Sequence, residues 1–174
     1  NHEIPEFYNF GFDVIEKRAL EADKTAFIYV SRDGSTIENH KFSDLNNDAN
    51  RFANVLCQLG IKKGDFAFVM IPRIPAWYQV MIGCIKTGII AMPGTNLLTS
   101  KDIEYRINKS HAKLAIVTSE SAEKIDNILA NCPSLKCLIV IGEDRKGWIN
   151  YYKACAEAST QLLREDVPKT RADD

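Results

Sequence analysis

The sequence predicts an α/β fold, a mostly parallel sheet with helices on both faces, preceded by an N-terminal helix and a hairpin. From Asp65 onward, short apolar runs alternate with helical stretches, and the runs are centred about 22 to 26 residues apart, a strand-helix-strand spacing. Runs that are apolar throughout are typical of strands buried on both faces. The predicted strands are residues 66–71, 89–92, 114–117 and 138–141.

The N-terminal part shows two different periodicities. Residues 9–22 carry apolar side chains at three- and four-residue steps, which predicts an amphipathic helix. Residues 25–31 are rich in β-formers and are followed by Asp33 and Gly34, after which residues 36–41 are again extended. This pattern predicts a β-hairpin.

The predicted helices are supported by start and stop signals. In the first long helix, residues 43–59, Ser43 is the expected cap and Gly60 ends the helix. Between the strands, start signals occur at Pro75, at Thr99 with Asp102, and at Ser119. The corresponding helices are residues 75–87, 100–110 and 119–131, and a further helix over 148–158 precedes a polar tail, residues 164–174.

Composition and charge exclude several classes of protein. Of the 174 residues, 45% are hydrophobic and 26% charged, which is typical of a globular domain. The net charge of −1 disfavours a nucleic-acid partner. The longest apolar stretch, residues 76–93, contains Lys86 and is too interrupted to span a membrane. Residues 1–5 do not resemble a signal peptide, so a cytoplasmic location is expected.

The five cysteines are odd in number and contain no C-x-x-C pair. We therefore expect buried free thiols, and a metal or disulfide role is the less favoured alternative. These residues are Cys57, Cys84, Cys132, Cys137 and Cys155.

No motif in the sequence predicts phosphate binding or nucleophilic catalysis. The pairs Gly83/Gly88 and Gly142/Gly147 have the spacing of a phosphate-binding loop, but each is followed by an apolar residue where lysine is required. We expect both pairs to be structural. His111 is expected to cap a helix, and the adjacent Trp77 and Tyr78 to serve the core or an interface. The prediction is therefore no catalytic residue and no metal ligand.

Ligands of parallel sheets bind beyond the carboxyl ends of the strands, where three loops are predicted here. These are residues 72–75, 93–100 and 118–121. The second is long for such a connection and carries a glycine and three hydroxyl side chains, so its backbone could approach an extended ligand. The alternative is that it only turns the chain.

The block of residues 71–95, Ile-Pro-Arg-Ile-Pro-Ala-Trp-Tyr through Ala-Met-Pro-Gly-Thr, resembles the N-terminal signature of the adenylate-forming acyl-CoA synthetases. It is particularly similar to medium-chain and related AMP-forming synthetases. Further matching segments are Phe42-Ser-Asp-Leu with the helix after it, Gly60-Ile-Lys-Lys-Gly-Asp, Ser100-x-Asp-Ile-x-Tyr-Arg and Cys132-Pro-Ser-Leu. The resemblance covers nearly the whole chain and implies the N-terminal subdomain of the adenylate-forming ligase fold.

The resemblance implies an activity for a longer protein. ATP would activate a carboxylic (fatty) acid to an acyl-adenylate, which is then transferred to coenzyme A, with Mg²⁺ in the full-length enzyme. The family's Ser/Thr/Gly-rich phosphate loop, its hinge and its catalytic lysine have no counterpart in this sequence. We therefore expect a fragment that is inactive alone and binds no cofactor, with residues 1–163 as the α/β portion and 164–174 as a linker or cut end.

The resemblance also implies the coenzyme A side of the site. Gly94, Thr95 and Leu97 match the loop that borders the pantetheine channel. Glycine admits a thin chain, and Thr95 could hydrogen-bond its amides, whereas Leu97 departs from the more polar residue expected. Lys124 is a weaker candidate for the coenzyme A phosphates, its alternative being a solvated helix charge.

Two other classes of protein remain open from the sequence. One is a free-standing flavodoxin-like α/β binding module, and the other is an interaction module that dimerises through an exposed sheet edge. Self-association is also expected of the fragment if strand 66–71 or 138–141 lies at a cut edge, because neither contains a charge.

Overall fold

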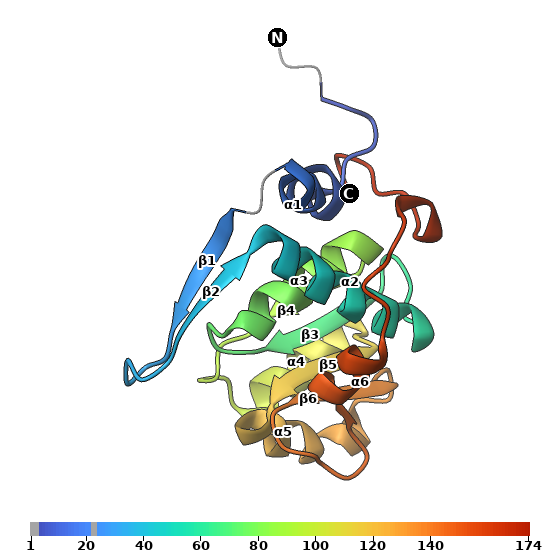
Figure 1. Cartoon of the computed structure of the whole chain (residues 1–174). Coiled ribbons are helices and arrows are strands. Elements are labelled where there is room, and N and C mark those ends of the chain that lie inside the picture. The colour runs from blue at the N-terminus through green and yellow to red at the C-terminus, as the bar shows by residue number, and fades with distance from the viewer. Residues whose placement is uncertain (1–3, 22–23) are drawn as a thin grey trace.

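The computed structural model describes residues 4–21 and 24–174, and within them the strands form two sheets (Figure 1). The larger is parallel, with strand order β4-β3-β5-β6-β7, and the smaller is the antiparallel hairpin β1-β2. This confirms the predicted fold class. The strands are β1 (Thr25–Val30), β2 (Ile37–Lys41), β3 (Phe66–Met70), β4 (Ile90–Pro93), β5 (Leu114–Thr118), β6 (Cys137–Ile141) and β7 (Ile149–Asn150).

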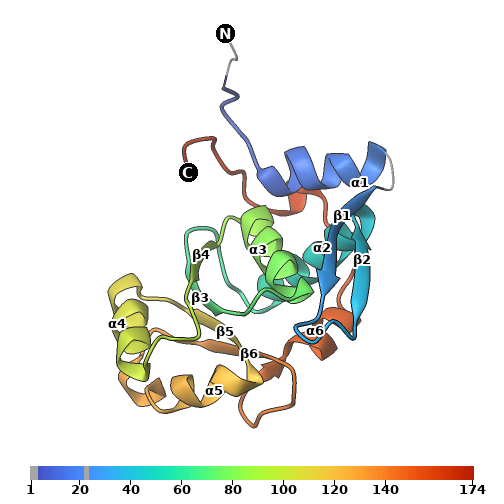
Figure 2. The same ribbon diagram turned by 90° about the vertical axis from the view of Figure 1, so that its left-hand side faces the viewer.

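Helices cover both faces of the parallel sheet, which Figure 2 shows from the side. Helices α2, α3 and α6 pack on one face, and α4 and α5 on the other. The helices are α1 (Lys17–Glu21), α2 (Phe42–Gln58), α3 (Pro75–Thr87), α4 (Ser100–Ser110), α5 (Ser119–Asp126) and α6 (Tyr151–Glu157). Short helical turns are η1 (Gly11–Glu16), η2 (Leu129–Asn131) and η3 (Arg164–Asp166).

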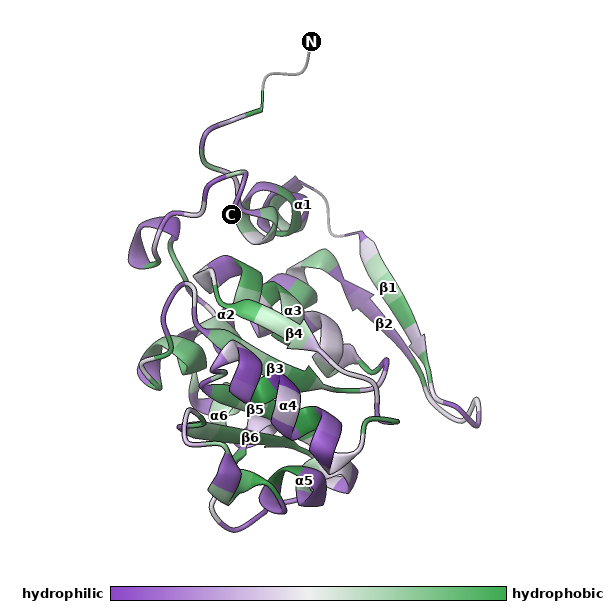
Figure 3. Cartoon of the chain, turned by 180° about the vertical axis from the view of Figure 1, so that it is seen from behind, coloured by the Kyte–Doolittle hydropathy of each residue, from purple (hydrophilic) through white to green (hydrophobic). Residues whose placement is uncertain are grey.

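Successive residues of β3 point to opposite faces and so join two separate cores. Val69 packs with Phe52 of α2 and Val80 of α3. Phe68 packs with Ile103 of α4 and Ile125 of α5. Because both faces are covered, every residue of β5 is buried, which explains its uninterrupted apolar sequence. In Figure 3 the strands of this sheet are green, between helices with purple outer faces.

The hairpin is held against α3 by a stack of three rings. The Phe27 ring lies 4.6 Å from the His40 ring and 4.6 Å from the Tyr78 ring, measured between centroids. Tyr78 therefore serves an interface, and Trp77 packs against the core, as the sequence predicted. The opposite face of the hairpin exposes Ile28, Val30 and Ile37.

The N-terminal helix is joined to α2 and α3 through a buried lysine. The ammonium of Lys86 lies 2.9 Å from a Glu16 carboxylate oxygen and donates to the side-chain oxygens of Asn46 and Asn50, each at 2.8 Å. It also lies 4.4 Å from the centroid of the Phe12 ring. Burial lowers the pKa of Lys86, and the Glu16 carboxylate opposes that shift. The lysine's three donors are thus paired.

The C-terminal segment is packed along the N-terminal one. The backbone amide of Tyr8 donates to Thr170, that of Ala172 donates to Glu6, both at 3.1 Å, and Arg164 forms a two-pronged ion pair with Asp13. The boundary predicted at residue 163 stays a prediction, but residues 164–172 make specific contacts in this structure.

Several predicted boundaries were wrong. The helix expected over 148–158 begins at Tyr151, because the Asn150 side chain caps it and residues 149–150 pair with β6 as strand β7. Ser43 does not cap α2, which begins at Phe42, where Asp44 accepts a hydrogen bond from the amide of Lys41.

The N-terminal helix contains a π-helical turn, η1, before α1, and its predicted end at Ala22 lies outside the described residues. The helix predicted over 119–131 is α5 followed by the separate turn η2. The strands proposed for a cut edge, β3 and β6, lie inside the sheet, whose edges are β4 and β7. In the described part of the chain, no helix has both the length and the hydropathy of a bilayer-spanning segment.

Candidate functional site

The β4–α4 loop, residues 94–99, follows the carboxyl end of β4 and is the candidate binding site. It corresponds to the longest of the three loops that the sequence predicted for ligand binding. It begins where the amide of Gly94 donates to the carbonyl of Val69 at 2.8 Å, which fixes it to β3. It ends at the predicted capping box of α4, where Thr99 and Asp102 exchange side-chain to backbone hydrogen bonds. Both ends of the loop are therefore fixed.

Gly94 lies against the core beneath this loop. A Cβ atom at this position would come within 2.8 Å of the Leu98 Cδ1 atom and 3.0 Å of the Phe68 Cζ atom. These distances are shorter than ordinary carbon contacts, so a larger residue would displace the loop or the Phe68 ring. Glycine is required here by the close approach of Leu98 and Phe68.

Thr95 and Leu97 lie on the outer side of the loop. The hydroxyl oxygen of Thr95 accepts a hydrogen bond from the amide of Leu97 at 3.3 Å, and both residues are exposed. The Leu97 side chain is 88% exposed, which places a large apolar group in solvent beside two polar residues. The predicted residues Gly94, Thr95 and Leu97 are thus brought together, with glycine underneath and the other two accessible.

Lys124 also belongs to this site, but its contacts are with protein. From α5 its ammonium donates to the carbonyl of Asn96 at 2.7 Å and to that of Leu98 at 2.9 Å. The sequence analysis had assigned it to phosphate or to solvent. In the structure, two of the three N–H groups of the Lys124 ammonium donate to the loop backbone.

The glycine pair Gly83/Gly88, which has phosphate-loop spacing, serves helix packing and helix termination, as predicted. Gly83 faces α2, where an added Cβ atom would lie 2.8 Å from the Phe52 ring. Gly88 ends α3 in the left-handed conformation, with φ of 72°. His111 likewise occupies the C-cap of α4, with φ of 53°.

The cysteines are all free in the structure, and their exposures differ. Cys84, Cys132 and Cys155 are buried as predicted, Cys137 is half-buried, and Cys57 is exposed. Burial raises the pKa of both Cys84 and Cys155 to about 12, so these thiols stay protonated at neutral pH.

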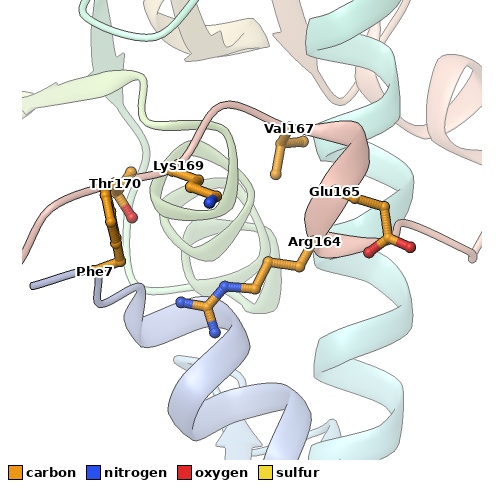
Figure 4. Close-up of a pocket in the computed structure, with 6 residues that line it drawn as sticks. All are labelled: Phe7, Arg164, Glu165, Val167, Lys169 and Thr170. Atoms are coloured by element: carbon orange, nitrogen blue, oxygen red, sulfur yellow. The ribbon is translucent and has the colours of Figure 1, made fainter. Parts of the chain in front are cut away.

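A hollow of about 450 Å³ lies away from the loop, between the two terminal segments (Figure 4). Its cations are already engaged, since Arg164 is paired with Asp13 and the Lys169 ammonium lies 5.2 Å from the Phe7 ring. It belongs to the packing of the terminal segments. Its lining residues are Phe7, Arg164, Glu165, Val167, Lys169 and Thr170.

A second hollow, of about 420 Å³, contains a polar relay that the sequence analysis missed. The Tyr151 hydroxyl donates to the Gln79 side-chain oxygen, and the Gln79 amide donates to Asp48, both at 2.8 Å. Burial raises the pKa of Tyr151 and that of Asp48. The one signal available was Gln79, a polar residue in the otherwise apolar first half of α3.

A sequence model described as "AMP-binding enzyme" matches residues 15–174. The chain belongs to the AMP-binding enzyme family. The chain is 37% identical over 166 residues to human "Acyl-coenzyme A synthetase ACSM5, mitochondrial", covering 91% of the chain and 28% of that protein. It is 36% identical over 169 residues to human "Acyl-coenzyme A synthetase ACSM1, mitochondrial", covering 92% and 29%.

Solved structures agree with this family. The fold is similar to that of the anthranilate CoA ligase AuaEII in complex with anthranoyl-AMP, with a TM-score of 0.80 and 26% identity, over 91% of the chain and 30% of that structure. A Brucella canis acyl-CoA synthetase also gives a TM-score of 0.80 at 26% identity, over 90% and 28%. The chain thus spans less than a third of the length of these proteins. The resemblance found in the sequence is confirmed.

Two earlier expectations change with these findings. A free-standing flavodoxin-like module is not favoured, because the relatives of this chain are acyl-CoA synthetases and ligases. The cytoplasmic prediction was wrong, because the curated relatives are mitochondrial. It had depended on residues 1–5 of this sequence, which contain no information on a leader elsewhere.

Proposed function

We propose that this chain functions as the N-terminal part of an AMP-forming acyl-CoA ligase. The whole enzyme would activate a carboxylic acid with ATP to an acyl-adenylate and transfer the acyl group to the thiol of coenzyme A. The observation that carries this proposal is the 37% identity to an acyl-CoA synthetase across 91% of the chain. The names of the curated relatives further support a mitochondrial location.

Within that enzyme, we assign the β4–α4 loop to the pantetheine arm of coenzyme A. The chemistry of the loop suits a thin polar chain. Gly94 adds no side chain to the floor, Thr95 offers an accessible hydroxyl, and Leu97 offers apolar surface for methylene groups. Leu97 supplies packing where a polar contact would otherwise be expected.

For the whole enzyme we also propose ATP as a substrate and Mg²⁺ as the metal ion. The residues of this chain alone do not form a binding site for either. The sequence has no glycine-rich phosphate loop with its lysine. Across residues 4–21 and 24–174, no group of three His, Cys, Asp or Glu side chains is placed to hold a metal ion. No step at the triphosphate is therefore derived from these residues.

The test uses the two half-reactions. A protein of the relatives' full length that contains this chain should exchange pyrophosphate into ATP when given a carboxylic acid, and should form a thioester when coenzyme A is added. The 174-residue chain alone should show no acid-dependent exchange above a heat-treated control, because its sequence has no glycine-rich phosphate loop with a lysine to stabilise the leaving pyrophosphate. Exchange by the chain alone, or no thioester from the longer protein, would contradict the proposal.

Self-association of the chain is also proposed, through a different surface from the one first expected. The strands β3 and β6 are inside the sheet, and the edge strand β4 ends in Pro93, which has no amide to donate. The outer face of the hairpin is apolar instead, with Ile28, Val30 and Ile37 between 53% and 71% exposed. Such a face on a two-stranded sheet favours a partner copy.

A further inference from the structure

Lys124 reaches across from α5 to the β4–α4 loop and holds its middle. Its ammonium is 2.7 Å from the Asn96 carbonyl oxygen and 2.9 Å from the Leu98 carbonyl oxygen. These carbonyls are 28 and 26 residues away in the sequence, so the contact joins two separate elements. Hydrogen bonds from a charged donor are stronger than those between neutral groups.

The other backbone anchors of the loop lie at its ends. Gly94 is bound to Val69 of β3, and Thr99 is fixed by the capping box with Asp102. Between them, the amides of Leu97 and Leu98 donate to Thr95, through its hydroxyl and its carbonyl respectively. Packing of the Leu98 side chain on the core fixes one side of that turn but leaves the carbonyls of Asn96 and Leu98 to be held by another element. Lys124 supplies this hold at the carbonyls of the turn.

From this geometry we propose that Lys124 is a positioning residue, which sets the shape of the loop for the pantetheine arm and does not bind the coenzyme A phosphates. Two of the three N–H groups of the ammonium already donate to these carbonyls, so a shift of the side chain away from them toward a phosphate would release the loop that the arm lies against. The proposal rests on the function proposed above for residues 94–97. It concerns the thiol-bearing arm that coenzyme A shares with pantetheine.

The contact of Lys124 with the loop carbonyls can be tested in the 174-residue chain without any ligand. In Lys124→Met, hydrogen exchange at the amides of Leu97 and Leu98 should become about tenfold faster, with the urea midpoint and the Gly94 amide unchanged. Lys124→Arg, which can still donate to both carbonyls, should restore slow exchange. Lys109→Met is the matched control, because Lys109 is an exposed lysine in the last turn of α4. Unchanged hydrogen exchange in Lys124→Met would show that Lys124 does not hold the loop.

The role in binding can be tested in the longer ligase with two thiol substrates. Lys124→Met should raise the KM for coenzyme A and for pantetheine by the same factor, about tenfold, and leave acid-dependent pyrophosphate exchange within about twofold. A loss confined to coenzyme A would show phosphate binding and overturn the proposal, as would equal loss in both half-reactions. If the unaltered enzyme forms no thioester, the proposed function fails, while the exchange experiment still decides whether Lys124 holds the loop.

Discussion

The ammonium of Lys86 lies 2.9 Å from the carboxylate of Glu16, and none of the lysine side chain is exposed to solvent. Glu16 belongs to the N-terminal helical segment and Lys86 to α3, 70 positions later in the sequence. The pair therefore joins the beginning of the chain to the helix layer on one face of the sheet.

Removal of Glu16 should destabilise the protein more than removal of Lys86. Glu16→Ala leaves a buried ammonium without its anion, and we expect a loss of about 2 to 3 kcal/mol, near the low end for buried pairs because Glu16 is a third exposed. Lys86→Met removes the buried charge and should cost less. Urea unfolding measures both.

The control for this comparison is Glu21→Ala, nearby in the N-terminal helix. Its ion pair with Arg18 has N and O atoms 3.5 Å apart and is about half exposed. The expected change is within about 0.5 kcal/mol. Equal losses in Glu16→Ala and Glu21→Ala would show that the buried pair contributes no more than a surface one.

Gly94→Val should separate the two half-reactions of the longer ligase. The added side chain would meet Leu98 and Phe68 and push the loop outward, so the KM for coenzyme A should rise about tenfold or more. The rate of adenylate formation, measured by pyrophosphate exchange, should change by less than about threefold and is the internal control. Loss of both activities together would mean that Gly94 supports the fold rather than the channel.

The cysteines should differ widely in reactivity. At pH 8 a thiol with a pKa of about 12, as for Cys84 and Cys155, has a thiolate fraction on the order of 10⁻⁴. Titration of the folded chain with a chromogenic disulfide should therefore leave Cys84 and Cys155 unreacted and show its fast phase at the exposed Cys57, with the half-buried Cys137 reacting more slowly. Cys57→Ser should abolish the fast phase and Cys84→Ser should preserve it. A fast phase that survives in Cys57→Ser would contradict the burial described for the other thiols.

Charge on the outer face of the hairpin should prevent self-association. We expect the 174-residue chain to form dimers at concentrations on the order of tens of micromolar. Ile37→Lys, at the most exposed of the three apolar residues on this face, should make it monomeric in sedimentation experiments. Leu20→Lys is the matched control, because Leu20 is 81% exposed but lies in α1. A wild-type chain that stays monomeric over a hundredfold concentration range would refute the proposed contact.

Much of the fold could be predicted because its signals are local. Strand β5 has a continuous apolar sequence, Pro75 begins α3, and Thr99 with Asp102 begins α4, all within a few residues. The two-residue strand β7 could not be predicted, because two residues are too few to show a period. Its pairing depends on β6, which lies earlier in the chain.

The site was predicted less completely, because its contacts are long-range. Gly94, Thr95 and Leu97 are close in sequence, and one motif indicated all three. The carbonyls that Lys124 binds leave no trace in the sequence, since any residue carries a carbonyl. Lys86 had been interpreted only as an interruption of an apolar stretch, because its partners Glu16, Asn46 and Asn50 are 36 to 70 residues away.

The pairing of residues 6–8 with residues 170–172 has a consequence for the order of synthesis and folding. A ribosome releases the N-terminal segment first, yet the partners of Tyr8 emerge more than 160 residues later. The sheet and its covering helices can form before then, whereas residues 6–8 can pair with residues 170–172 only when Thr170 has left the exit tunnel. Residues 6–8 are thus synthesised well before residues 170–172, and they can pair only after those partners have emerged.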